Sequence, residues 1–180
     1  MQGLLIRLAR TSDLPAINEI YNREVLSGTS TFDTEPRDAD AAARWFEEHD
    51  AARHPVIVAV ESGTVVAWAS LSPWSRRGAY SRTVEGSLFV AADRRGTGLG
   101  RSLTRELVAR AAAAGHHVVL ARVEASNQAS LALLVGEGFT EVGTMHEVGH
   151  KFDADLDVVL FELVLAEPET AAEAGSAEDG

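Results

Sequence analysis

Residues 85–101, Glu-Gly-Ser-Leu-Phe-Val-Ala-Ala-Asp-Arg-Arg-Gly-Thr-Gly-Leu-Gly-Arg, carry the strongest chemical signal in this chain of 180 residues. Glycines at positions 96, 98 and 100 precede a run with helical spacing, which predicts a glycine-rich loop leading into a helix. Backbone amides at such a helix N-terminus can surround a phosphate, and the helix dipole favours its negative charge. Each hydrogen bond to a charged group contributes about 1.5 to 3 kcal/mol, so a few amides make a phosphate site.

The spacing of these glycines narrows the kind of phosphate ligand. Gly-x-Gly-x-Gly differs from the Gly-x-Gly-x-x-Gly of dinucleotide-binding folds, and no Gly-Lys-Ser/Thr follows to make a nucleotide P-loop. With Arg95 before it, the pattern resembles the acetyl-CoA loop of the GNAT superfamily of N-acetyltransferases, in which the loop holds the CoA pyrophosphate. The alternative is a glycine-rich turn before an ordinary helix.

Composition argues against several classes of protein. The formal net charge of −11, from 16 basic and 27 acidic residues, disfavours a nucleic-acid partner, because phosphate contacts need a basic face. The absence of cysteine excludes disulfides, thiol nucleophiles and cysteine-ligated metals. No apolar run approaches the roughly 18 to 20 residues that span a bilayer, and residues 1–10 lack the features of a secretory signal. We therefore expect a cytoplasmic protein without a membrane partner.

Hydrophobic periodicity and turn residues predict eleven elements in the order β-α-α-β-β-β-α-β-α-β-β. The plainest feature is a hairpin around Ser62-Gly63. One domain is expected over residues 1–165, followed by an acidic tail at 166–180 whose composition is typical of disorder. The expected strands are 4–8, 56–61, 64–72, 84–90, 118–123, 141–148 and 156–165, and the helices begin near residues 13, 38, 99 and 127.

A polar segment, 27–36, separates the first two helices and is long for a simple connection. Long irregular loops in compact domains tend to be functional. Phe32 is therefore a candidate wall of the substrate pocket. It could equally be a buried hydrophobic anchor for the loop.

More of the sequence adds to the resemblance. Within the GNAT superfamily, the chain resembles the phosphinothricin N-acetyltransferase family and its methionine-sulfone and methionine-sulfoximine acetylating relatives, over about residues 4–165. The more telling motifs are Thr31-Phe-Asp-Thr-Glu-Pro36 and Thr83-Val-Glu85. The resemblance implies a mixed α/β GNAT fold, a homodimer, and direct transfer of the acetyl group from acetyl-CoA to the amino group of a small amino-acid-like substrate. It implies no metal.

The resemblance also implies the residues that hold acetyl-CoA. The strand before the loop would pair with the pantetheine arm and offer a backbone amide to the thioester oxygen. Asn127 would bond to the CoA arm, although a helix cap is an equally good interpretation. The implied strand residues are Leu88, Phe89 and Val90, and the implied pyrophosphate residues are Arg95, Gly96, Thr97, Gly98, Leu99, Gly100 and Arg101.

For the acceptor side, the resemblance implies Glu85 as the base that removes a proton from the attacking amine, directly or through water. The competing interpretation is a structural Glu85 paired with Arg76, Arg77 or Arg82. Arg77 and Tyr80 would face the acceptor, where a guanidinium can bind a carboxylate with two hydrogen bonds. A surface arginine is the alternative for Arg77.

Departures from the family pattern leave the acceptor open. Leu134 stands where the superfamily often has Tyr and this family often His, and Leu156 stands where the herbicide-detoxifying members carry His. His116 and His117 precede a strand and point to opposite faces, so we expect no metal site there. The remaining alternatives are an N-acetyltransferase for another small amine or a protein N-terminus, and a non-catalytic acyl-CoA sensor.

Overall fold

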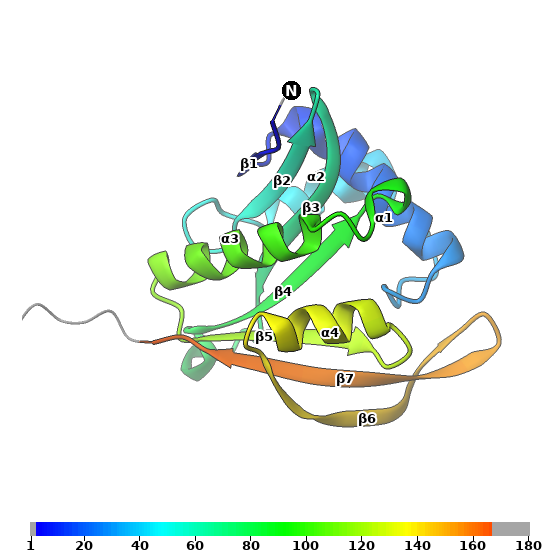
Figure 1. Ribbon diagram of the computed structural model, residues 1–180, viewed down its shortest axis with the longest axis vertical. Coiled ribbons are helices and arrows are strands. Elements are labelled where there is room, and N and C mark those ends of the chain that lie inside the picture. Colours follow the sequence, from blue (N-terminus) through cyan, green and yellow to red (C-terminus); the bar gives the residue numbers. More distant parts are fainter. Residues whose placement is uncertain (1–2, 167–180) are drawn as a thin grey trace, which may run out of the picture.

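The computed structural model describes residues 3–166, and these form one seven-stranded mixed sheet with helices on both faces (Figure 1). The strand order is β1-β2-β3-β4-β5-β7-β6, in which only β4 and β5 are parallel neighbours. The predicted fold class and element order are confirmed. The strands are β1 (Leu5–Leu8), β2 (Val56–Glu61), β3 (Thr64–Pro73), β4 (Thr83–Val90), β5 (Val118–Glu124), β6 (Thr140–Lys151) and β7 (Ala154–Val164).

Local sequence explains where the helices begin. α1 (Leu14–Ser27) has Pro15 in its first turn, and the Asp38 side chain accepts a hydrogen bond from the Ala41 amide at 2.7 Å at the start of α2 (Ala39–Glu47). Gly98 has the left-handed φ of +88° directly before α3 (Leu99–Ala113). α4 (Gln128–Gly136) begins one residue after the predicted position, since Asn127 is its cap.

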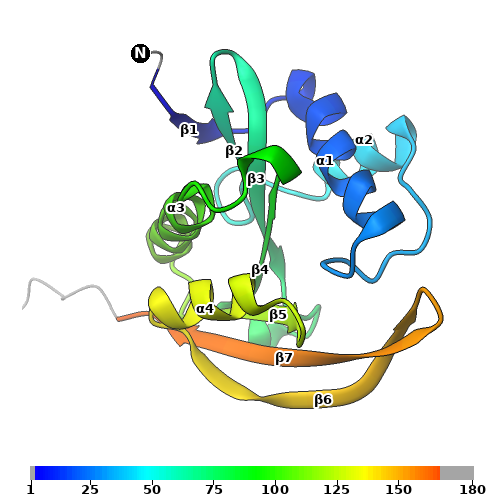
Figure 2. The same cartoon turned by 45° about the vertical axis from the view of Figure 1, so that its right-hand side comes forward.

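Helices α1 and α2 cover one face of the sheet, and helices α3 and α4 cover the other face (Figure 2). α1 and α2 pack on the face that presents Trp68 and Phe89, whereas α3 packs on the face that presents Leu71. This division follows from the alternation of side chains along β3 and β4. None of the helices in the described part of the chain is long and apolar enough to cross a membrane.

The sheet divides between its two parallel strands. β4 pairs with β5 only through Thr83, Val84 and Glu85, whereas its pairing with β3 continues from Val84 to Val90. Beyond Glu85 the two strands separate, and the second half of β4 has a backbone edge directed into the gap. The site therefore has to be sought where β4 leaves β5.

The predicted tail, residues 166–180, lies outside the described residues except for Ala166. The second hairpin, β6–β7, is longer than predicted, since β6 extends from Thr140 to Lys151 with an irregular pairing between Met145 and Gly149.

Candidate functional site

A cavity of about 560 Å³ lies on the α1/α2 face where the strands separate, and we call it the acceptor cavity. Side chains along β3 and β4 alternate between the two faces of the sheet, so every second residue of these strands faces the cavity. Three of the predicted site residues, Glu85, Phe32 and Phe89, line it. The lining consists of Tyr21, Thr29, Ser30, Thr31, Phe32, Asp33, Arg37, Trp45, Trp68, Ser70, Ser72, Glu85, Ser87, Phe89, Arg122, Glu124, Met145, Val148 and Val158.

Glu85 is paired across the gap with Arg122 of β5. Arg122 Nε donates to Glu85 Oε1 at 2.6 Å, and Arg122 Nη2 donates to Glu85 Oε2 at 2.8 Å. The hydrogen bond to Glu85 also raises the pKa of Arg122. Glu85 thus has a cationic partner, as one interpretation of the sequence expected, but the partner is Arg122 and none of the three arginines considered there.

The other two carboxylates of the cavity also accept hydrogen bonds within the chain. Asp33 Oδ2 accepts from the Tyr21 hydroxyl at 2.6 Å, and burial together with this carboxylate raises the pKa of Tyr21 to about 12. Glu124 accepts from the Ser126 hydroxyl at 2.6 Å and from Thr29 at 3.0 Å. Burial opposes ionisation of Glu124, but these hydrogen bonds prevail and hold its pKa below the usual value.

Arg37 brings a second cation to the acceptor cavity. Its guanidinium carbon lies 3.9 Å from the ring centre of Tyr21 and 4.6 Å from that of Trp45. Its Nε and Nη2 atoms are buried and have no hydrogen-bond partner. Burial lowers the pKa of Arg37, because a charged group has been moved away from water. A buried guanidinium with unused donors is costly unless an anion satisfies it.

The loop before Arg37 is attached to the β6–β7 hairpin. The buried Lys151 ammonium donates to the Thr31 carbonyl at 2.8 Å and to the Glu24 carbonyl at 3.3 Å. The Phe32 ring packs so closely on Gly149 that a side chain at position 149 would displace it. Phe32 is 38% exposed, so it is a cavity wall that rests on the hairpin rather than a fully buried anchor.

On the other face, the glycine-rich loop has the geometry that its sequence predicts. Gly96 and Gly98 have φ values of +75° and +88°, and a Cβ at either position would meet no atom within 4 Å. The first intrahelical hydrogen bond of α3 joins the Ser102 amide to the Gly98 carbonyl at 3.1 Å. The amides of Leu99, Gly100 and Arg101 therefore precede the first bonded turn, with open space above Gly98. This arrangement can receive a pyrophosphate.

The two predicted loop arginines each have an acidic partner. Arg95 Nη2 donates to Glu24 of α1 through a short hydrogen bond, and Arg101 Nε lies 2.9 Å from Glu137 Oε1. Glu137 also accepts from Arg105, and these hydrogen bonds hold the pKa of Glu137 below its usual value. Both arginine side chains remain more than half exposed, at 52% and 58%. They can therefore still reach a phosphate beside the loop.

The other predicted cofactor residues lie along the gap. Phe89 lines the acceptor cavity, and Leu88 and Val90 pack with the α3-side core. Asn127 Oδ1 accepts a hydrogen bond from the Ser130 amide at 3.1 Å, so Asn127 is the cap of α4. Only the oxygen is used in this cap, and the amide nitrogen remains a possible donor.

Arg77 and Tyr80 are not brought to the acceptor cavity in this chain. Tyr80 lines a second cavity of about 520 Å³ with Arg53, His54 and Arg82, and Arg77 is an exposed residue that lines neither. The proposed substrate roles of both residues stay predictions. Within residues 3–166, no group of three or more acidic or histidine side chains is arranged to hold a metal.

Sequence reasoning missed the two arginines of the acceptor cavity. Arg37 directly follows the motif that ends at Pro36, and Arg122 interrupts the apolar strand Val-Val-Leu-Ala-Arg-Val. A charged residue inside such a strand was the available signal, since it needs a partner when the strand is central.

A sheet split between two parallel strands, with a glycine-rich helix terminus on one face and a polar cavity on the other, is the architecture of an acyl-CoA-dependent acyltransferase. The acetyltransferase (GNAT) family model matches residues 15–139. The chain belongs to this family and is an N-acetyltransferase.

Two curated relatives and one solved structure agree with this assignment. The chain is 41% identical to L-amino acid N-acyltransferase MnaT of Escherichia coli (strain K12), covering 90% of this chain and 94% of the relative. It is 37% identical to an L-methionine sulfoximine/L-methionine sulfone acetyltransferase of Salmonella typhimurium, covering 91% and 96%. A GNAT superfamily phosphinothricin acetyltransferase from Sinorhizobium meliloti in complex with AcCoA superposes with a TM-score of 0.88 at 31% identity, covering 97% and 95%. The predicted branch of the family is thereby confirmed.

Proposed function

We propose that this protein transfers an acetyl group from acetyl-CoA to the α-amino group of a small amino acid, of the phosphinothricin, methionine-sulfone or methionine-sulfoximine type. The observation that carries the acceptor class is Arg37. Arg37 lines the acceptor cavity, and two nitrogens of its guanidinium are buried without a hydrogen-bond partner. A carboxylate is the ligand that a guanidinium binds best, by paired hydrogen bonds.

The donor would lie on the α3/α4 side of the gap. The amides that open α3 would bind the pyrophosphate, with Arg95 and Arg101 beside them. The pantetheine arm would follow the free edge of β4 past Leu88 and Val90. Acetyl-CoA would supply a thioester carbonyl, and a β4 backbone amide would stabilise the charge that develops on its oxygen.

The acceptor would enter from the α1/α2 side. With its carboxylate on Arg37, its amino group would point toward Glu85 and the end of the gap. Glu85 would accept a proton from the ammonium, directly or through a water molecule, in competition with the Arg122 donors. The amine then attacks the thioester directly, without an acyl-enzyme, and the thiolate leaves. A thiol with a pKa near 8.5 can leave as the thiolate without an enzymic acid. This is consistent with Leu134, which cannot donate a proton.

We also propose a homodimer, in keeping with the family resemblance. β6 is an edge strand, and Val142, Val148 and Phe152 on this hairpin are 53%, 53% and 56% exposed. Long edge strands with apolar side chains are usually covered. Sedimentation of the protein at micromolar concentration tests this proposal: a monomer throughout would contradict it.

A thiol-release assay with acetyl-CoA and a panel of acceptors tests the function. The panel contains L-methionine sulfone, L-methionine sulfoximine, phosphinothricin, L-methionine, the decarboxylated amine of methionine and an alanine-initiated peptide. We expect turnover of the free amino acids and at least tenfold lower kcat/KM for the amine without a carboxylate, because Arg37 loses its partner.

Other outcomes of the panel would favour the alternatives. Faster turnover of the peptide would identify a protein N-terminus as the acceptor. Binding of acetyl-CoA without turnover of any amine would identify an acyl-CoA sensor and overturn the proposed activity.

A further inference from the structure

Ser72 places a hydroxyl in the acceptor cavity beside Glu85. The two residues are directly paired between β3 and β4, and both line the cavity. Side chains opposed in this way lie on the same face of the sheet, with Cβ atoms about 4.5 to 5.5 Å apart. The Ser72 hydroxyl is thus at the end of the cavity where the strands separate, within reach of an amine or of a water bound to it.

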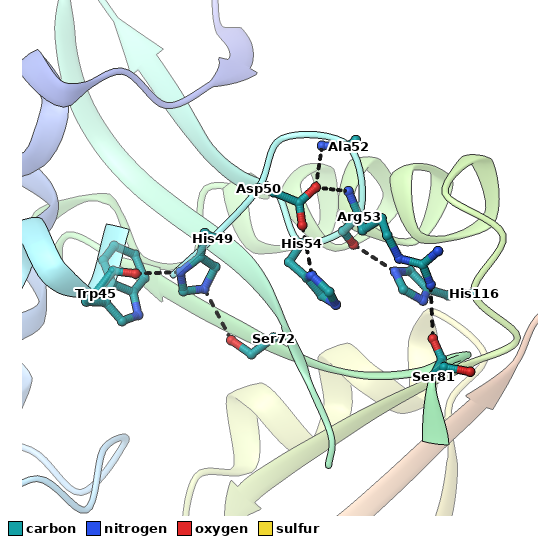
Figure 3. Close-up of polar contacts among 9 residues, drawn as sticks. All are labelled: Trp45, His49, Asp50, Ala52, Arg53, His54, Ser72, Ser81 and His116. Carbon is teal, nitrogen blue, oxygen red and sulfur yellow. Dashed lines mark hydrogen bonds and ion pairs between the residues drawn. The ribbon is translucent and has the colours of Figure 1, made fainter. Parts of the chain in front are cut away.

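His49 lies behind this hydroxyl, just after α2 and outside the cavity lining (Figure 3). His49 Nε2 is 3.2 Å from Ser72 Oγ, and His49 Nδ1 is 2.7 Å from the Trp45 carbonyl oxygen. A carbonyl oxygen only accepts, so Nδ1 carries the proton in this contact. In the neutral ring Nε2 then has a lone pair, and the Ser72 hydroxyl donates to it. The pair can move a proton away from the cavity.

The surroundings keep His49 in the neutral form near pH 7. Burial lowers its pKa, and the contact with the Trp45 carbonyl offsets this only in part. The charged groups around it are Glu48 and His54 on its own segment, and Arg37 from the preceding loop. Glu85 lies across from its Ser72 partner.

The carboxylates of the cavity, by contrast, already accept hydrogen bonds from donors of this chain. Arg122 binds both oxygens of Glu85, Tyr21 binds Asp33, and Ser126 and Thr29 bind Glu124. A proton taken up by Glu85 competes with the Arg122 donors and must leave before the next turnover. A group beyond Glu85 that accepts this proton would restore the carboxylate.

We propose that Ser72 and His49 form a proton relay for the acetyl transfer, in which the proton lost by the acceptor ammonium reaches His49 Nε2 through the Ser72 hydroxyl. This inference rests on the proposed function. An N–H bond of the ammonium breaks, and its proton passes, by Glu85 or a water, to Ser72 Oγ. The Ser72 O–H proton moves at the same time to His49 Nε2. The freed amine pair forms the amide bond while the C–S bond breaks. Of the two protons that the ammonium loses overall, one ends on the CoA thiol and one leaves through His49.

The test compares His49→Gln, Ser72→Ala and the control His54→Gln. His54 is a neighbouring histidine that contacts Asp50 and does not line the acceptor cavity (Figure 3). For each protein, kcat and kcat/KM for the fastest acceptor of the panel are measured from pH 5 to 9. Calorimetry gives the acetyl-CoA Kd, and thermal melting gives the Tm.

The wild-type rate should fall as pH drops below the ordinary histidine range, because only the neutral ring accepts a proton. His49→Gln and Ser72→Ala should each lower kcat by roughly tenfold or more and remove this acid limb. His54→Gln should keep the rate and an acid limb, with at most a shift of its midpoint because His54 is one of the charged groups around His49, and acetyl-CoA Kd should change less than twofold in all variants. A merely structural role would not remove the acid limb.

Nuclear magnetic resonance of ring-labelled histidine gives an independent readout. At pH 8 the neutral His49 ring should carry its proton on Nδ1. A proton on Nε2 would overturn the relay, and so would a His49→Gln enzyme with the wild-type rate and acid limb. Wild-type protein that turns over no amine would overturn the proposed function and the relay together, whereas active wild type with either contrary result overturns the relay alone.

Discussion

Glu85 and Arg122 form a two-bond ion pair across the point where β4 and β5 separate, with N–O distances of 2.6 and 2.8 Å. Glu85 is the last residue of β4 that pairs with β5, so this ion pair stands at the narrow end of the gap. The pair lies on the side of the acceptor cavity, opposite the glycine-rich loop. In the proposed reaction, the acceptor amine would pass beside Glu85 on its way to the thioester.

The first prediction separates the chemistry of Glu85 from the stability of this ion pair. Glu85→Gln keeps the shape of the side chain but cannot accept a proton, and should lower kcat by roughly 10² while leaving acetyl-CoA affinity unchanged. Arg122→Gln removes the same ion pair and keeps the carboxylate, so it should retain most of the rate. Steady-state kinetics of both variants decide the matter: equal losses would mean that the ion pair is structural and that Glu85 is not a proton acceptor.

The second prediction concerns the phosphate loop. Gly98→Val places a branched side chain in the open space above α3, and should weaken acetyl-CoA binding at least tenfold, about 1.4 kcal/mol. The matched control is Gly63→Val in the β2–β3 turn, whose φ of +83° and empty surroundings impose a similar backbone strain far from the loop. Calorimetry on the two folded variants should show a loss for Gly98→Val only. Unchanged affinity in both would rule out the phosphate-binding role.

Features of the fold that depend on residues close together in the sequence could be predicted from the sequence. The hairpin at Ser62-Gly63 forms as its sequence predicts, and both turn residues have positive φ. Asp38 and Asn127 cap the helices that follow them. The glycine-rich loop was also found in this way, because its signal lies within a few residues.

The partners of the site residues could not be read from the sequence. Glu85 meets Arg122 from 37 positions away, and Arg95 meets Glu24 from 71 positions away. These contacts depend on the parallel register of β4 and β5 and on how α1 crosses the sheet, and no local pattern encodes either. Arg37 is near its motif in sequence, but its missing hydrogen-bond partners become visible only once Tyr21 and Trp45 enclose it.

The third prediction compares two arginines as receptors of the acceptor carboxylate. Arg37→Gln should raise KM for an amino-acid acceptor by one to two orders of magnitude and change KM for the decarboxylated amine little, because only the carboxylate loses its paired charge. Arg77→Gln, outside the cavity lining, should leave both KM values near wild type if the site lies within one chain. The opposite result would return the role to Arg77, which would then have to reach the site from another subunit. Thermal melting controls for the loss of packing on Tyr21 and Trp45.

The last prediction concerns stability and pH. His116 is 4% exposed, its Nε2 contacts the Arg53 carbonyl at 2.7 Å, and burial lowers its pKa. The unfolded chain, with an ordinary histidine pKa near 6.5, takes up a proton at a higher pH than the folded protein does. The free energy of unfolding should therefore be highest above about pH 6.5 and fall as pH decreases through and below that value.

Urea unfolding at pH 8 and at pH 5.5 measures this loss of stability. His116→Gln should be less stable than wild type at pH 8 and should lose less stability on acidification, since one of the groups that bind the proton in the unfolded state is gone. His150→Gln is the matched control, because His150 is exposed and contacts only Asp155 among the described side chains. Burial also lowers the pKa of His49, so the free energy of unfolding of His116→Gln should still depend on pH, but less than in the wild type. A His116→Gln protein with the full wild-type dependence would place the acid sensitivity elsewhere.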